Sequence, residues 1–281
     1  MNCSKNNKGG GRPWRVPGAG GSRCVSAGRA LAVPALLLMQ LLGFAPEAEA
    51  LGGVSNSKVT VLSADTVPRG VVELEPYFSA EFADDRDNTR KYGGGLRITP
   101  GITDFLEAGV SINFFNVEDS DLIRAENDFG HIDSGLKLRL IDEGAGSPFS
   151  LAYVAGVTFP VDKGAEWVVE PAGLVLTKNF TDRFSLDADL VVGLIEGGSW
   201  SLAANTGLGY YVTPWLQAVV EGAYAFEGAD GGGDVSIINV TGGFTANAAE
   251  WLTVIVGVTP DIYVKNDDRL VVLTAAFTFA F

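Results

Sequence analysis

Apolar and polar side chains alternate at every second position along most of the chain after residue 70, which constrains the fold more than any other feature. A period of two is typical of a β-strand with one apolar and one polar face, whereas a helix repeats after about 3.6 residues. In residues 105–116 the apolar positions are Leu106, Ala108, Val110, Ile112 and Phe114, and the positions between them include Glu107, Ser111 and Asn113. Similar alternation elsewhere predicts an all-β fold.

About twelve alternating segments follow one another, and most are long for strands of a soluble protein but suited to a tilted bilayer crossing. They cover roughly residues 71–84, 91–99, 105–116, 129–141, 148–160, 167–178, 183–195, 200–212, 215–227, 234–246, 250–259 and 269–281. The sixth segment alternates poorly, so the sequence does not assign its two faces. Short turns alternate with connections that are usually longer and acidic. This pattern predicts a transmembrane antiparallel β-barrel of about 12 strands in a bacterial outer membrane.

The N-terminal stretch has the composition of a targeting sequence rather than of a folded domain. Residues 1–29 are basic and contain no acid, residues 30–45 are apolar, and the stretch ends in Ala48-Glu49-Ala50. We therefore expect residues 1–50 to be a cleaved signal peptide, with an uncleaved anchor as the alternative. Both cysteines lie in this stretch, so the mature chain would contain none.

The mature chain is expected to have two parts. Residues 51–70 precede the first alternating segment, and we expect them to form a periplasmic N-terminal segment outside the barrel, including Lys58. Residues 71–281 are expected to form the outer-membrane β-barrel, embedded in outer-membrane lipid.

Aromatic residues lie where a membrane barrel places them. An amphipathic aromatic ring prefers the level of the lipid headgroups, and the expected aromatic girdle consists of Trp167, Trp200, Trp215 and Trp251, all at predicted strand ends. The chain ends in Phe279 and Phe281, which resemble the C-terminal assembly signal that barrel-insertion machinery reads, with Ala276 in the place of the usual glycine. The alternative fold is a soluble β-sandwich or a secreted barrel, which also alternates but needs neither feature.

The polar face of the strands would line the lumen of such a barrel. The candidate lumen-lining residues are Glu73, Glu75, Glu81, Arg97, Glu107, His131, Asp133, Lys137, Arg139, Arg183, Asp187, Asp189 and Glu221. One interpretation is a structural network, in which opposite charges pair between neighbouring strands. The other is a transverse electric field across a pore, which would orient polar or amphiphilic solutes.

Composition argues against several other functions. The chain has 34 acidic and 20 basic residues, so it lacks the basic surface that a nucleic-acid partner requires. It has a single histidine, His131, which offers little for a zinc site or a catalytic triad. Ser134 is three residues away and points to the opposite strand face, which disfavours a lipid-acting barrel enzyme. The sequence therefore predicts no catalytic residues, no metal site and no cofactor.

The entry into the first expected strand, Val67-Pro68-Arg69-Gly70-Val71-Val72-Glu73-Leu74-Glu75, resembles that of a family of outer-membrane transporters associated with the meta-pathway of phenol degradation. This resemblance implies a barrel that takes up or exports small, often hydrophobic or aromatic, compounds. We therefore expect a passive channel or transporter for an unidentified small-molecule solute. The alternatives are a structural or surface-interaction barrel without transport, and a lipid-acting barrel enzyme.

Overall fold

The computed structural model describes residues 53–56, 58–84, 89–119, 126–128, 130–161, 166–228 and 234–281, and the expected signal peptide lies outside these ranges. The strands are β1 Val72–Ala83, β2 Arg90–Thr103, β3 Leu106–Asp119, β4 Glu126–Asp128, β5 His131–Ile141, β6 Ser150–Pro160, β7 Val168–Asn179, β8 Phe184–Ile195, β9 Trp200–Thr213, β10 Leu216–Gly228, β11 Val235–Ala249, β12 Leu252–Lys265 and β13 Leu270–Ala280. The described residues contain one short 3-10 helix, Glu143–Ala145, and no helix long and apolar enough to span a membrane.

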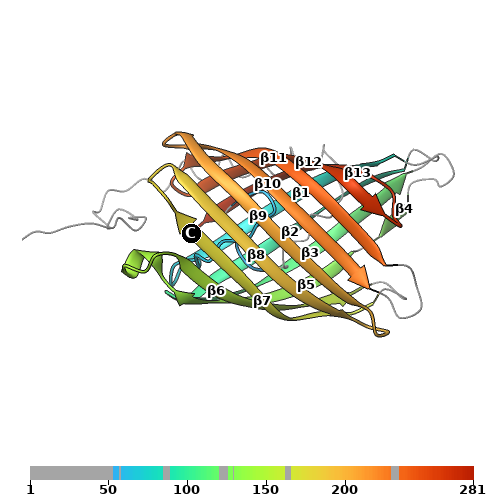
Figure 1. The fold of residues 1–281 in the computed structure, drawn as a ribbon, viewed down its shortest axis with the longest axis horizontal. Helices are drawn as coiled ribbons and strands as arrows, with labels where there is room; N and C mark the ends of the chain where they lie inside the picture. The colour runs from blue at the N-terminus through green and yellow to red at the C-terminus, as the bar shows by residue number, and fades with distance from the viewer. Residues whose placement is uncertain are drawn as a thin grey trace, which may run out of the picture.

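The strands form a closed barrel (Figure 1). Each long strand pairs antiparallel with the long strands before and after it in the sequence. The three-residue β4 pairs with the end of β3, and β3 also pairs with β5. The first and last strands complete the ring, because β1 pairs antiparallel with β13. The predicted 12-stranded antiparallel barrel is therefore confirmed.

The two ends of the barrel differ. Five short turns connect the strands at one end, which we call the turn end, and the remaining connections lie at the other, the loop end. Val72 and Phe281 exchange two backbone hydrogen bonds of 3.1 Å, so the barrel begins and finishes at the turn end, marked C in Figure 1. In outer-membrane barrels the short turns face the periplasm.

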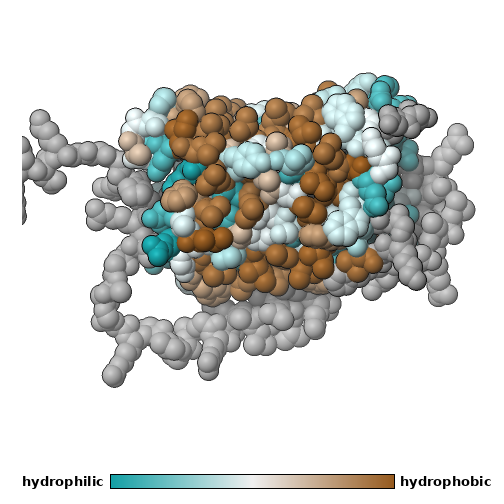
Figure 2. Space-filling view, turned by 90° about the horizontal axis from the view of Figure 1, so that it is seen from below, coloured by the Kyte–Doolittle hydropathy of each residue, from teal (hydrophilic) through white to brown (hydrophobic). Residues whose placement is uncertain are grey.

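The outer surface of the barrel is apolar. Figure 2 shows hydrophobic side chains over the side of the barrel and hydrophilic residues toward its ends. Many large apolar side chains on this surface are exposed, among them Leu136, Leu174, Leu190, Leu208 and Val220. A closed barrel with an apolar exterior leaves no unpaired strand edge in lipid. This architecture places the protein in a bacterial outer membrane.

Strand β7 corresponds to the segment whose alternation was poor, and the structure gives the reason. Its register with β8 shifts between Val169 and Ala172, and its register with β6 shifts at the same level. The extra residue at Pro171 moves the buried side from the even positions to the odd positions, where Gly173 and Val175 are buried. A β-bulge of this kind interrupts any simple two-residue pattern.

The N-terminal segment does not lie outside the barrel, and the expectation for residues 51–70 is wrong in this respect. Its described part, which we call the lumen segment, comprises residues 53–56 and 58–70 and makes its hydrogen bonds to the inner wall. The physical reason is the size of the barrel. Eight strands enclose a space that wall side chains can fill, whereas twelve enclose more, and the buried charges of the wall need partners.

Candidate functional site

The lumen segment crosses the lumen and returns. Its start lies against the wall of β2, β3 and β5, where Thr99 Oγ1 donates a 3.1 Å hydrogen bond to the Gly53 carbonyl. Its middle reaches another part of the wall, where Val59 packs against Val219 and Ile255 of β10 and β12. An antiparallel bridge between Asn56 and Leu62 marks the turn back, so the segment forms a loop across the barrel interior.

Glu107 on β3 fastens both ends of this loop. Its carboxylate accepts a 2.8 Å hydrogen bond from the Ser55 backbone N–H and a 2.6 Å hydrogen bond from the Val67 backbone N–H. The Ser55 hydroxyl donates a further hydrogen bond of 2.8 Å. One wall carboxylate therefore holds two points of the segment that are twelve residues apart in sequence.

Lys137 on β5 completes this first attachment. Its Nζ lies 3.1 Å from Glu107 Oε1, and both side chains are 0% exposed. The same ammonium donates hydrogen bonds of 2.8 Å to the Ser55 carbonyl and 3.0 Å to the Asp65 carbonyl. A buried ion pair is favourable only when further hydrogen bonds satisfy the two charged groups, and here the lumen segment supplies them.

Lys58 makes the second attachment. This residue is 1% exposed, and its ammonium forms a short ion pair with Asp187 on β8. The ammonium also donates a 3.3 Å hydrogen bond to Ser185 Oγ, while Thr177 donates a hydrogen bond to the other oxygen of the Asp187 carboxylate. The single lysine of the lumen segment is therefore fully engaged with the wall.

Two further wall carboxylates accept backbone N–H groups from the segment. Glu221 on β10 accepts 2.9 Å hydrogen bonds from Val59 N and Thr60 N, and a 2.5 Å hydrogen bond from the Thr60 hydroxyl. Asp189 on β8 accepts a 3.0 Å hydrogen bond from Leu62 N and a 2.7 Å hydrogen bond from the Asn205 amide. The wall thus satisfies backbone groups that have no strand partner, which a buried loop requires.

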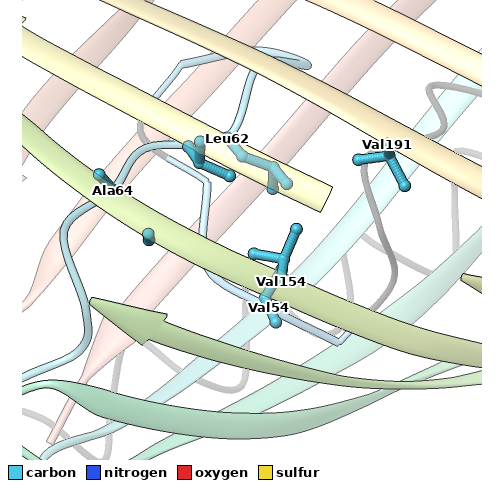
Figure 3. Close-up of a cluster of buried hydrophobic side chains, with 7 residues drawn as sticks. Val54, Leu62, Ala64, Val154 and Val191 are labelled. Carbon is cyan, nitrogen blue, oxygen red and sulfur yellow. The ribbon is translucent and has the colours of Figure 1, made fainter. Parts of the chain in front are cut away.

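Apolar packing supports these polar attachments. Figure 3 shows Val54, Leu62 and Ala64 of the lumen segment beside Val154 and Val191 of the wall. Each of these side chains is almost completely buried. Part of the inner wall is therefore apolar and is covered by the segment, which removes that surface from water.

The remaining predicted lumen residues form smaller groups on the wall. Arg97 and Glu75 pair on adjacent strands with a 2.5 Å contact, and Thr278 donates a hydrogen bond to the same carboxylate. Glu81 is buried on the inner face of β1, and Glu73 shares that face. His131 Nε2 lies 3.3 Å from Asp133 Oδ2 on the same face of β5.

Two predicted residues lie near the turn end. Arg139 donates a 2.5 Å hydrogen bond to the Asp104 carbonyl and lies 3.7 Å from an Asp65 carboxylate oxygen. Arg183 is exposed in the turn before β8, at the end of the barrel. The alternation of residues 183–195 includes Arg183, and its carbonyl accepts a 2.8 Å hydrogen bond from Tyr211 N of β9, although the strand itself begins at Phe184.

The aromatic candidates lie at both ends of the barrel and are exposed. Trp167 and Trp200 lie at the loop end, and Trp215 and Trp251 lie at the turn end. The Trp251 ring stacks on Phe279 with a centroid distance of 6.1 Å, and Phe279 stacks on Phe281 at 6.5 Å. Aromatic rings at both levels fit the position of headgroups around a membrane barrel.

Sequence reasoning missed the lumen segment and, with it, the role of Lys58. The segment contains a signal that points inward, since Val54, Val59, Val61 and Leu62 give it more apolar character than a solvated leader needs. The acceptors that it meets were among the predicted lumen residues: Glu107, Asp187, Asp189 and Glu221. In the described residues, the site is therefore a charged lumen occupied by a segment of the same chain.

The comparison with known proteins rests on structure. No protein-family model and no curated protein matches this chain. The fold is similar to a COG4313 outer membrane channel from Pseudomonas putida F1, with a TM-score of 0.65 and 14% identity, over 78% of this chain and 98% of that one.

Two porins are less similar. A KdgM porin in complex with disordered oligogalacturonate has a TM-score of 0.50 and 10% identity, over 74% of this chain and 99% of that one. The NanC porin has a TM-score of 0.50 and 7% identity, over 73% and 98% of the two chains. At these identities the likeness shows a shared outer-membrane barrel fold.

Proposed function

We propose that this protein is an outer-membrane channel for small solutes whose lumen segment controls passage. The observation that carries the proposal is that four buried wall carboxylates bind a segment preceding β1. A barrel stabilised only by its wall would pair these charges between strands, as Arg97 and Glu75 do. The fold shared with a channel and two porins supports the same function.

The solute class follows from the two kinds of surface that the segment covers. The inner wall offers carboxylates on β3, β8 and β10, and it offers an apolar surface around Val154, Val175 and Val191. We propose that solutes are small and amphiphilic, with a hydrophobic or aromatic part that lies on the apolar surface. The resemblance of the entry segment to transporters of the phenol-degradation family supports this part of the proposal.

Conductance in planar lipid bilayers tests the proposed function. The mature protein is compared with a variant that lacks residues 53–67, which removes the loop and keeps the start of β1. We expect low conductance from the mature protein and at least a several-fold increase from the variant, because the loop crosses the lumen. If the variant forms a heat-modifiable barrel and passes no more current than the mature protein, the segment does not control passage.

The same recordings separate the proposal from a purely structural or surface-interaction barrel. A structural barrel would pass no current while the loop is in place, whereas a channel should show a small but measurable current from the mature protein. If a substitution of Glu221 blocks or alters the current measured from either form, that current passes through this lumen.

A further inference from the structure

The Lys58 side chain lies in a groove of the barrel wall whose shape matches an alkylammonium group. Gly207 and Gly209 on β9 form the floor of this groove. A methyl group on Gly207 would lie 3.0 Å from Lys58 Cδ, and one on Gly209 would lie closest to Gln217 Nε2 and 2.9 Å from Lys58 Cε. Any larger residue at these two positions would therefore displace the methylene chain of the lysine.

The strand register places an acceptor beside each part of this floor. Gly207 is paired with Asp187 on one side and with Glu221 on the other, so the two carboxylates lie on either side of the groove. Gly209 is paired with Ser185 and Val219 in the next row. The groove thus combines a narrow glycine floor with Asp187 and Ser185 as acceptors for an ammonium group.

The groove belongs to the wall, whereas the group that fills it belongs to the lumen segment. Asp187 and Glu221 are at most 2% exposed, and the described contacts of their carboxylates with cations or backbone N–H groups come from the segment. The wall cation Lys137 is engaged by Glu107 and by the lumen segment. Withdrawal of the segment would remove the Lys58 ammonium from Asp187 and expose both carboxylates to the lumen, where the cation of a solute could take its place.

We propose that this groove is a binding site for primary alkylammonium solutes, and that Lys58 occupies it when the channel is closed. The inference rests on the proposed function, because it names the solute class of the same lumen. A primary ammonium group has three N–H donors, which match Asp187 and Ser185 as Lys58 does. Quaternary ammonium ions carry the same charge but have no N–H donor.

Chemical rescue of a Lys58→Ala variant tests this site. The substitution removes the atoms from Cγ to Nζ, which correspond to n-propylammonium, and leaves the groove vacant. We expect n-propylammonium to raise the temperature at which the Lys58→Ala barrel loses its heat-modifiable form, in a saturable manner. At ten times its dissociation constant, the ligand should increase the ratio of folded to unfolded protein about 11-fold. The proposal would be overturned if n-propylammonium gave no shift at any concentration that leaves the mature protein unaffected.

Three controls assign the effect to the groove. Tetramethylammonium and n-propanol should each give no shift, because the first lacks donors and the second lacks charge. A Gly207→Val substitution added to Lys58→Ala should abolish the rescue by filling the floor, because the nearest atom to a side chain at Gly207 is Lys58 Cδ. A Lys58→Met protein should not respond, because its side chain already occupies the groove. Equal shifts with n-propylammonium and tetramethylammonium would show an unspecific cation effect and contradict the proposal.

Two further measurements keep the test decisive. If Lys58→Ala does not fold alone, the readout is the yield of heat-modifiable barrel after refolding with n-propylammonium. A yield no higher than that with tetramethylammonium would overturn the proposed site. Bilayer conductance separates this inference from the proposed function. Rescue without current from any form supports the site and removes the channel, whereas current without rescue supports the channel and removes the alkylammonium site.

Discussion

Lys58 and Asp187 are 129 residues apart in the chain and form an ion pair in which both side chains are 2% exposed. The lysine precedes the first strand, and the aspartate lies on β8. The pair therefore joins the lumen segment to the β8 part of the barrel wall, which surrounds the segment. Its energetics decide how firmly the segment stays in place, because a buried charge that loses its partner is strongly destabilising.

The first prediction concerns this pair. Lys58→Met removes the ammonium and keeps most of the aliphatic chain, and Asp187→Asn removes the opposite charge. Each substitution should lower the free energy of unfolding by about 3–5 kcal/mol, because each leaves an uncompensated buried charge. The double variant should lose clearly less than the sum of the two. Urea unfolding in lipid vesicles, followed by tryptophan fluorescence, measures all four proteins, and additive losses would contradict the pairing.

The second prediction concerns Glu107, which fastens both ends of the lumen segment. Glu107→Gln should cost about 3–5 kcal/mol of unfolding free energy, because Lys137 would remain fully buried without its carboxylate. Glu143→Gln is the matched control. Glu143 pairs with Lys178 near the turn end, where both side chains are partly exposed, and its loss should cost at most about 1 kcal/mol. Equal midpoints in urea for the two variants would rule out the special role of Glu107.

The third prediction concerns the lipid-facing surface. Leu190 is near the middle of β8 and 45% exposed, so Leu190→Arg should destabilise the barrel by about 2–4 kcal/mol in a bilayer. Val212 faces outward close to the turn end of β9, where the same substitution should cost only about 0–1 kcal/mol. Unfolding in vesicles measures the difference. A larger loss at Val212 would place the membrane at another level of the barrel.

The fourth prediction concerns assembly. We propose that barrel-insertion machinery reads the aromatic end of β13, and Phe281→Asp should therefore reduce the amount of heat-modifiable barrel in outer-membrane fractions and increase periplasmic degradation. Phe105→Asp is the control, because Phe105 is also an exposed aromatic residue at the turn end but lies in a turn. Similar membrane levels of the two variants would indicate that Phe281 acts only as a lipid-facing side chain.

The structure also changes an expectation about ion selectivity. Arg97, Lys137 and Arg139 were candidates for setting the field of an open pore. In the described state Arg97 is paired with Glu75, and Lys137 is enclosed by Glu107 and the lumen segment. Lys58, which was expected to lie outside the barrel, is the base that neutralises Asp187. A Lys58→Gln substitution should therefore change the ion selectivity of the lumen.

Local pattern was enough to predict the barrel itself. The alternation that includes Glu107 and Val110 is typical of a strand with one polar and one apolar face. Strand β3 has these two faces, with Glu107 buried inside the barrel and Val110 exposed outside. The strand number, the outward surface and the positions of the tryptophans follow from the same period-two pattern. They could be predicted because a strand assigns each side chain to a face by its position alone.

Only the tertiary structure decided how the lumen is filled. The lumen segment has no strand period, and its bonds to Glu107, Asp187 and Glu221 join parts of the chain that are 52–162 residues apart. The bulge at Pro171 likewise depends on pairing with both neighbouring strands. Sequence alone determined which strand residues face inward wherever the period of two is unbroken, because that is a local property of a strand. Closure of the barrel decided which of them meet, because their contacts exist only after the first and last strands have paired.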